Sequence, residues 1–308
     1  MSLAGGFTVR EVDTATDLPA VHDLVTACDV EDVGEPDVQA WIATAWQGEL
    51  LRGAWLVHDA RGEVAAYVEL ESVDPSSSID GFLPTHPRHR EGSLRPALLS
   101  FVRERAQILA SGDDVALWVS GPSTDEAFGR DAVRSGFRKV RVFAHMERPI
   151  DPSYDPGDPP PGVTIRPSVD PDDDPVVHRL LEETFVGHFG IEPMPFEAWR
   201  REFKNELYDP SLVLLAELDG EPVGVATSWL PEGLGWVGEL GVLAPVRGRG
   251  IGAALLRASF FALAGRGVTR VRLNVDADNT TGAARLYGSV GMRVRRSFDV
   301  YETRLGGR

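Results

Sequence analysis

Short apolar runs with the spacing of strands and helices recur along the chain in an order that repeats once. Each half reads as a strand, helices, antiparallel strands, then strand–helix–strand–helix and a last strand. Val115–Val119 matches Val271–Val275, and Phe7–Glu11 matches Val163–Pro167, both 156 positions apart. Matches in order at a nearly constant offset predict a duplicated domain. Each copy is predicted to be α/β, a mixed sheet with helices on both faces.

A stretch rich in proline and aspartate, Glu147–Gly162, separates the two copies. Proline denies the chain helical and ladder hydrogen bonds, which favours an extended and fairly stiff linker. The sequence therefore predicts a first domain over residues 1–148, a linker over 149–162 and a second domain over 163–308.

A glycine-rich turn after one strand of the second copy is the sharpest chemical signal in the chain. The strand is expected to end near Leu243, and a helix to begin near Ile251. Gly248, Gly250 and Gly252 occupy every second position across the expected start of the helix. At these positions no side chain blocks an oxygen ligand from the backbone. Amides at a helix N-terminus hold anions, and this favours a diphosphate site.

Three other interpretations of this turn fit its residues less well. A Walker A loop needs a lysine that the turn lacks. A Rossmann fingerprint fits Gly248-x-Gly250-x-x-Ala253, with Asp276 as the ribose acid, but only about 55 residues follow it, too few for a dinucleotide fold. An ordinary glycine-rich turn would not need three alternating glycines flanked by Arg247 and Arg249.

The segment Arg247-x-x-Gly250-x-Gly252, which follows Val242 and Pro245, resembles the acetyl-CoA motif of the GNAT superfamily of N-acetyltransferases. Downstream, Asn279, Leu286-Tyr287 and Gly291-Met292 resemble a second block of that superfamily, with Met292 where phenylalanine is commoner. The resemblance implies two tandem acetyltransferase-type domains, and acetyl transfer from acetyl-CoA to a primary amine of a small molecule without a metal. The residues expected to bind the cofactor are Leu240, Gly241, Val242, Arg247, Gly248, Arg249, Gly250, Ile251, Gly252, Ala253 and Asn279.

The chemistry of amide formation suggests the catalytic groups. A primary amine has a pKa near ~10 and must lose a proton before it attacks a thioester. Glu239 is the candidate base, or else a solvent-facing strand residue or one that orients the substrate. The N–H of Leu240 or Val242, on a strand splayed from its neighbour, could stabilise the oxyanion. By resemblance, Tyr287 is the acid that protonates the leaving thiolate.

The first copy lacks these groups. Aligning Leu98-Leu99 with Leu255-Leu256 places Arg90 on Arg247, Ser93 on Gly250 and Arg95 on Gly252. The equivalent alignment places Ala132 on Tyr287. We therefore expect a degenerate first domain without catalytic activity. A degraded first copy beside a functional second one is similar to the tandem enzymes of the mycothiol synthase type.

The charge and composition of the chain limit the classes of molecule that it is expected to bind. The formal charge of −16 and the pI near 4.9 oppose nucleic-acid binding and are compatible with cationic amines. No apolar run reaches the roughly 18–20 residues that span a bilayer, and no secretory signal precedes the first strand. A single cysteine, Cys28, favours the cytoplasm. Alternative functions are a vestigial acetyl-CoA-binding regulatory module and a protein N-terminal or side-chain acetyltransferase. Neither oligomeric state nor acceptor identity follows from the sequence.

Overall fold

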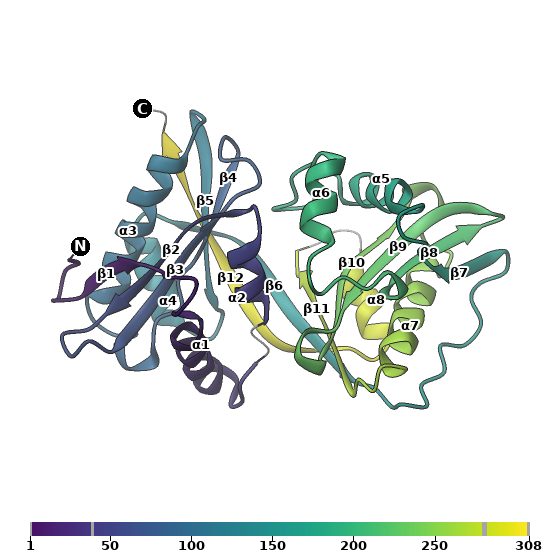
Figure 1. Ribbon diagram of the computed structural model, residues 1–308, viewed down its shortest axis with the longest axis horizontal. Helices are drawn as coiled ribbons and strands as arrows, with labels where there is room; N and C mark the ends of the chain where they lie inside the picture. Colours follow the sequence, from purple (N-terminus) through teal and green to yellow (C-terminus); the bar gives the residue numbers. More distant parts are fainter. Residues whose placement is uncertain (1, 38–39, 279–281, 307–308) are drawn as a thin grey trace. The chain divides into compact units, whose positions relative to one another are not determined.

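A computed structural model describes residues 2–37, 40–278 and 282–306 of the chain. The chain forms two compact units, which are described separately (Figure 1). Unit 1 comprises Met1–Phe143 together with Arg296–Arg308, and unit 2 comprises Ala144–Arg295. The C-terminal strand of the chain is therefore part of the sheet of unit 1.

Unit 1 follows the order of elements that the sequence predicts. Its elements are β1 (Thr8–Glu11), α1 (Leu18–Val33), α2 (Ala40–Gln47), β2 (Leu51–His58), β3 (Val64–Glu71), β4 (Ser78–Phe82), the 3-10 turn η1 (Pro87–His89), α3 (Leu94–Leu109), β5 (Asp114–Pro122), α4 (Glu126–Arg134) and the beginning of β6 (Arg138–Pro149).

Unit 2 repeats this order. Its elements are β7 (Val163–Pro167), α5 (Asp174–Phe185), α6 (Phe196–Phe203), η2 (Pro210–Leu212), β8 (Val213–Leu218), β9 (Glu221–Trp229), η3 (Pro231–Gly233), β10 (Gly235–Val242), η4 (Ala244–Val246), α7 (Ile251–Ala264), β11 (Arg270–Asp276), α8 (Ala283–Ser289) and the beginning of β12 (Arg293–Gly306).

The two sheets have the same topology with their last strands exchanged. Unit 1 has the strand order β1-β2-β3-β4-β5-β12, and unit 2 has the corresponding order β7-β8-β9-β10-β11-β6. In both, the first four strands are antiparallel and the fourth and fifth are parallel. The units therefore divide within β6 and β12, and not at the linker. The proline-rich composition that follows indicates that β6 ends at Pro149. Which sheet β6 joins depends on long-range strand pairing, which composition does not show.

Helices cover both faces of each sheet, as predicted, because the strand residues alternate between two cores. In unit 2, Leu215 and Val225 pack with Leu180 of α5, whereas Leu214 and Ala226 pack with Leu255 of α7. In unit 1, Leu56 and Tyr67 pack with Leu24 of α1, whereas their neighbours Val57 and Val68 pack with α3. Period-two burial of this kind is what a sheet between two helical layers requires. Among the described helices, none is long and apolar enough to cross a membrane.

The exchange of β12 predicts that unit 1 depends on residues far from it in sequence. Leu305 lies on β12, is 2% exposed and packs in the core of unit 1. Leu305→Ala should destabilise unit 1 by roughly 2–5 kcal/mol, the range for a leucine truncated in a packed core. Hydrogen exchange should show the loss of protection in residues 2–143.

Val294→Ala on the same strand is the control for this change, since Val294 is 59% exposed and belongs to unit 2. Loss of protection confined to unit 2 after Leu305→Ala would contradict the exchange.

Candidate active site

A bulge interrupts the edge of β10 that pairs with β9. Val237 lies opposite Ser228 and Leu240 lies opposite Ala226, so Gly238 and Glu239 together face a single residue, Thr227. An extra residue of this kind bends the strand and redirects the side chains beside it. Gly238 is required here, because a Cβ at this position would lie 1.6 Å from the ring of Trp229.

On its other edge, β10 diverges from its parallel neighbour β11. The described strands pair from Gly235–Val237 of β10 to Val271–Leu273 of β11 and no further. Leu243 N donates to Val223 O at 2.9 Å, and because bonded pairs alternate along an antiparallel ladder, Gly241 N also faces β9. The N–H groups of Leu240 and Val242 therefore face the opening between β10 and β11, and the predicted splay is present.

The glycine-rich turn presents bare amides at the start of α7. Gly248 has φ +78° and Gly250 has φ +83°, a left-handed conformation that favours glycine. The first hydrogen bond of α7 runs from Ala254 N to Gly250 O at 3.0 Å. The amides of Ile251, Gly252 and Ala253 come before it and have no partner within the helix. Together with the helix dipole, these amides make an anion site.

The other residues of the loop differ in what they contribute. Arg247 Nε donates to Val242 O at 2.8 Å, which ties the loop to the end of β10. Arg249 is exposed and forms no ion pair with another described residue. A Cβ at Gly252 would lie 3.3 Å from Leu286, so glycine here also lets α7 approach α8 closely. Asn279, predicted to bind the cofactor, lies outside the described residues.

Glu239 lies within the bulge on the face that α5 covers. Its carboxylate accepts a hydrogen bond from the Thr227 hydroxyl, and its own N–H donates to that hydroxyl oxygen at 2.9 Å. Burial raises the pKa of the Glu239 carboxyl above its usual range, and the Thr227 hydrogen bond opposes part of that rise. A carboxylate with a raised pKa beside a strand opening is suited to accept a proton.

Tyr287 lies on α8 and packs in the core that α7 and α8 share. It is 8% exposed and contacts the cluster that contains Phe260 and Met292. Burial raises its pKa to about 12. Among the described residues, none hydrogen-bonds the Tyr287 hydroxyl. The phenol is thus protonated at neutral pH and has a hydrogen bond to give.

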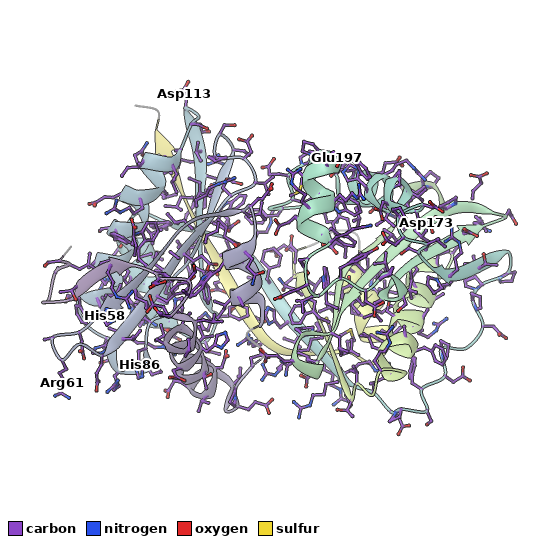
Figure 2. All side chains as sticks on the ribbon, in the orientation of Figure 1. His58, Arg61, His86, Asp113, Asp173 and Glu197 are labelled. Atoms are coloured by element: carbon purple, nitrogen blue, oxygen red, sulfur yellow. The ribbon has the colours of Figure 1, made fainter. Side chains whose placement is uncertain are left out.

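A row of aromatic side chains beside Glu239 was not anticipated from the sequence. Trp229 and Trp236 are directly opposite each other on β9 and β10, and both are half-buried. Phe203 of α6 lies 6.4 Å from Trp229, and His145 of β6 lies 5.6 Å from Trp236, measured between ring centroids. Figure 2 labels Glu197 in the first turn of α6 and Asp173 just before α5, which mark the helices over this face. The four side chains of this row come from four different elements. They are separated in the sequence, so the row cannot be recognised until the register of the strands is known.

In unit 1 the equivalent of the glycine-rich turn is occupied by internal ion pairs. Arg90 Nη2 donates to Asp32 Oδ2 at 2.9 Å. Arg95, at the position of Gly252, is 3% exposed and its Nη1 donates to Asp125 Oδ1 at 3.1 Å. Two carboxylates of unit 1 therefore already satisfy arginines that would otherwise face a bound anion. The pairing of β4 with β5 also continues through Gly81↔Val119.

Comparisons with known proteins show the family and the fold of the chain. Residues 174–292 match the model of the acetyltransferase (GNAT) family. A mycothiol acetyltransferase from Saccharopolyspora erythraea is 30% identical over 238 residues, 73% of this chain and 78% of that protein. A GCN5-related N-acetyltransferase from Sphaerobacter thermophilus superposes with a TM-score of 0.86 at 32% identity, covering 100% of this chain and 98% of that one. A tandem GNAT protein from the clavulanic acid biosynthesis pathway shares the fold, with a TM-score of 0.74 at 16% identity over 98% and 99% of the two chains.

The anion site at α7 predicts a specific effect of charge. Gly250→Asp should raise the Kd for CoA more than tenfold, because a carboxylate would face the diphosphate and φ +83° strains any L-residue. Titration calorimetry with CoA measures the change.

Gly92→Asp is the matched control, since Gly92 precedes α3 in unit 1 with φ +100° and open space around it. An equal loss of affinity in the two variants would contradict the assignment of the site to unit 2.

Proposed function

This chain belongs to the acetyltransferase (GNAT) family and transfers acetyl from acetyl-CoA to the amine of a small molecule, and we propose that unit 2 carries out the reaction with Glu239 and Tyr287. The observation that carries the proposal is the opening between β10 and β11, which adjoins both an anion site and the half-buried carboxylate of Glu239. We further propose that the first domain, expected over residues 1–148, is not catalytic, because Arg90 and Arg95 are engaged by its own carboxylates.

The proposed cofactor path follows from the amides at the start of α7 and from those that face the opening between β10 and β11. The diphosphate would lie on the amides of residues 248–253, with Arg247 and Arg249 adding positive charge. The pantetheine arm would extend along Leu240–Val242, whose N–H groups face the opening where β11 has diverged. The extended pantetheine arm carries amide groups. It can therefore form hydrogen bonds with the part of β10 that β11 does not pair with, as an added strand would.

The opening places the thioester between two faces of the sheet. Glu239 lies on the face of α5, and Tyr287 on the face of α7 and α8. We propose that the Glu239 carboxylate accepts the amine proton, directly or through a water, as the nitrogen attacks the thioester carbon. The N–H of Leu240 or Val242 stabilises the resulting oxyanion. The C–S bond then breaks, and the sulfur takes the proton of the Tyr287 hydroxyl. A phenol with a pKa of about 12 keeps its proton until the thiolate forms.

We propose as acceptor the amine that mycothiol acetyltransferases acetylate, because relatives of that name match most of this chain. Trp229 and Trp236 would give the acceptor an apolar platform beside Glu239, and the charge of −16 favours a cationic amine. The reaction is proposed to need no metal and to take place in the cytoplasm. The test is mass-spectrometric detection of acetylated product with this acceptor, against an aminoglycoside, a polyamine, an amino acid and a peptide N-terminus. A higher kcat/KM for any of these would redirect the assignment.

The pH profile tests the base. As the pH falls through the raised pKa of Glu239, the carboxylate is protonated and kcat/KM for the amine should fall. This acidic limb of the pH profile adds to the fall that protonation of the amine itself causes. Thr227→Val removes a hydrogen bond that lowers this pKa, so the limb should move to higher pH. Glu239→Gln should lose about 10²-fold in kcat/KM and lose this limb. A limb that persists in Glu239→Gln would exclude Glu239 as the base.

Substitution of the phenol tests the acid. Tyr287→Phe keeps the buried ring but removes the proton donor, so kcat should fall by about 10²-fold while the Kd for CoA stays within twofold. Steady-state kinetics and calorimetry give the two values. Tyr301→Phe, a buried tyrosine of unit 1, is the control and should leave both unchanged. Equal kcat for Tyr287→Phe and the wild type would remove Tyr287 from the mechanism.

A further inference from the structure

Residues 150–162, here called the strap, have no helix or strand yet pack against α7 of unit 2. Ile150 is buried, and its N–H donates to Thr269 O at 2.8 Å, in the connection between α7 and β11. Tyr154 meets Phe260 of α7 edge-on, with 6.0 Å between ring centroids. The strap is thus a packed segment, where its composition alone predicts a spacer. Figure 1 shows its course from β6 past α7 to β7.

The later contacts of the strap move toward the N-terminal end of α7. Arg257 Nε donates to Pro156 O at 2.8 Å. Pro160 then lies against Gly250, where the proline Cγ would be 3.4 Å from a Cβ. Tyr154, Pro156 and Pro160 are partly buried, whereas the residues between them are exposed. The strap therefore follows α7 from its end to the anion site at its start.

Pro160 is the one described residue beyond the chain neighbours that would come within 4 Å of a Cβ at Gly250. Gly250 adopts φ +83°, and this conformation directs the amides that begin α7. A loop that is held in its binding conformation before the ligand arrives avoids the entropy cost of ordering at binding. A proline has a fixed φ and loses little entropy when it is ordered, so it suits a contact of this kind.

We propose that the strap is a positioning element of the acetyl-CoA site, which holds the start of α7 and the glycine-rich loop ready for the diphosphate. The inference rests on the proposed cofactor site in unit 2 and adds a specific role for Pro160 and Arg257. The segment between the two copies then contributes to cofactor affinity and is more than a connection.

A matched pair of prolines tests the strap. Pro160→Gly removes the ring that lies beside Gly250 and frees the backbone, whereas Pro159→Gly frees the backbone at an exposed position. Pro160→Gly and Arg257→Ala should each raise the KM for acetyl-CoA and the Kd for CoA by about 3–10-fold. The kcat at saturating acetyl-CoA and the KM for the amine should stay within twofold. Pro159→Gly should resemble the wild type.

A donor that lacks the diphosphate separates positioning from general stability. With acetylpantetheine as donor, Pro160→Gly and Arg257→Ala should have the same kcat/KM as the wild type, because the loop then has no diphosphate to hold. An equal loss with both donors, or no loss with acetyl-CoA, would overturn the role of the strap. A wild-type protein that binds no CoA would instead overturn the proposed function, and this inference with it.

Discussion

The divergence of β10 from β11 is the constraint on which the rest of unit 2 depends. Parallel strands normally satisfy each other's backbone groups along their whole length, and buried groups left unpaired cost free energy. Here the pairing stops at Val237 and Leu273, and the bulge at Gly238–Glu239 turns the following residues of β10. The N–H groups of Leu240 and Val242 face the opening that results between the described strands, where a ligand can reach them. The opening also connects the face of Glu239 with the face of Tyr287.

The two copies show how one scaffold supports or loses an anion site through a few side chains. In unit 2 the loop has glycines at positions 248 and 250 in the left-handed conformation, so its backbone amides are accessible to an anion. In unit 1, Arg90 and Arg95 pair with Asp32 and Asp125, so the charges that could attract phosphate are neutralised within the unit. Buried charges need partners, and an internal carboxylate supplies one permanently. The exchange of β6 and β12 explains why a first copy without an anion site would be retained. Each sheet contains a strand from the other half of the chain, so neither sheet is complete without both copies.

The sequence predicts the local features of this protein well and the long-range ones poorly. The duplicated order of elements and the helices on both faces follow from periodicity, and the structure confirms them. The left-handed glycines before α7 follow from residue type. The exchanged strands do not, because the pattern of β12 is equally compatible with either sheet. The aromatic row of Trp229, Trp236 and His145 depends on register and on the exchanged β6. The composition of the strap predicts a linker because proline excludes regular structure. Proline does not exclude packing, however, and the strap packs against α7.

A crystal structure of the protein with CoA tests the central claim most directly. The account predicts electron density for the diphosphate on the amides of residues 248–253, with the sulfur in the opening between β10 and β11 near Tyr287. CoA bound at the loop before α3 in unit 1, or in unit 2 with its sulfur away from this opening, would contradict it.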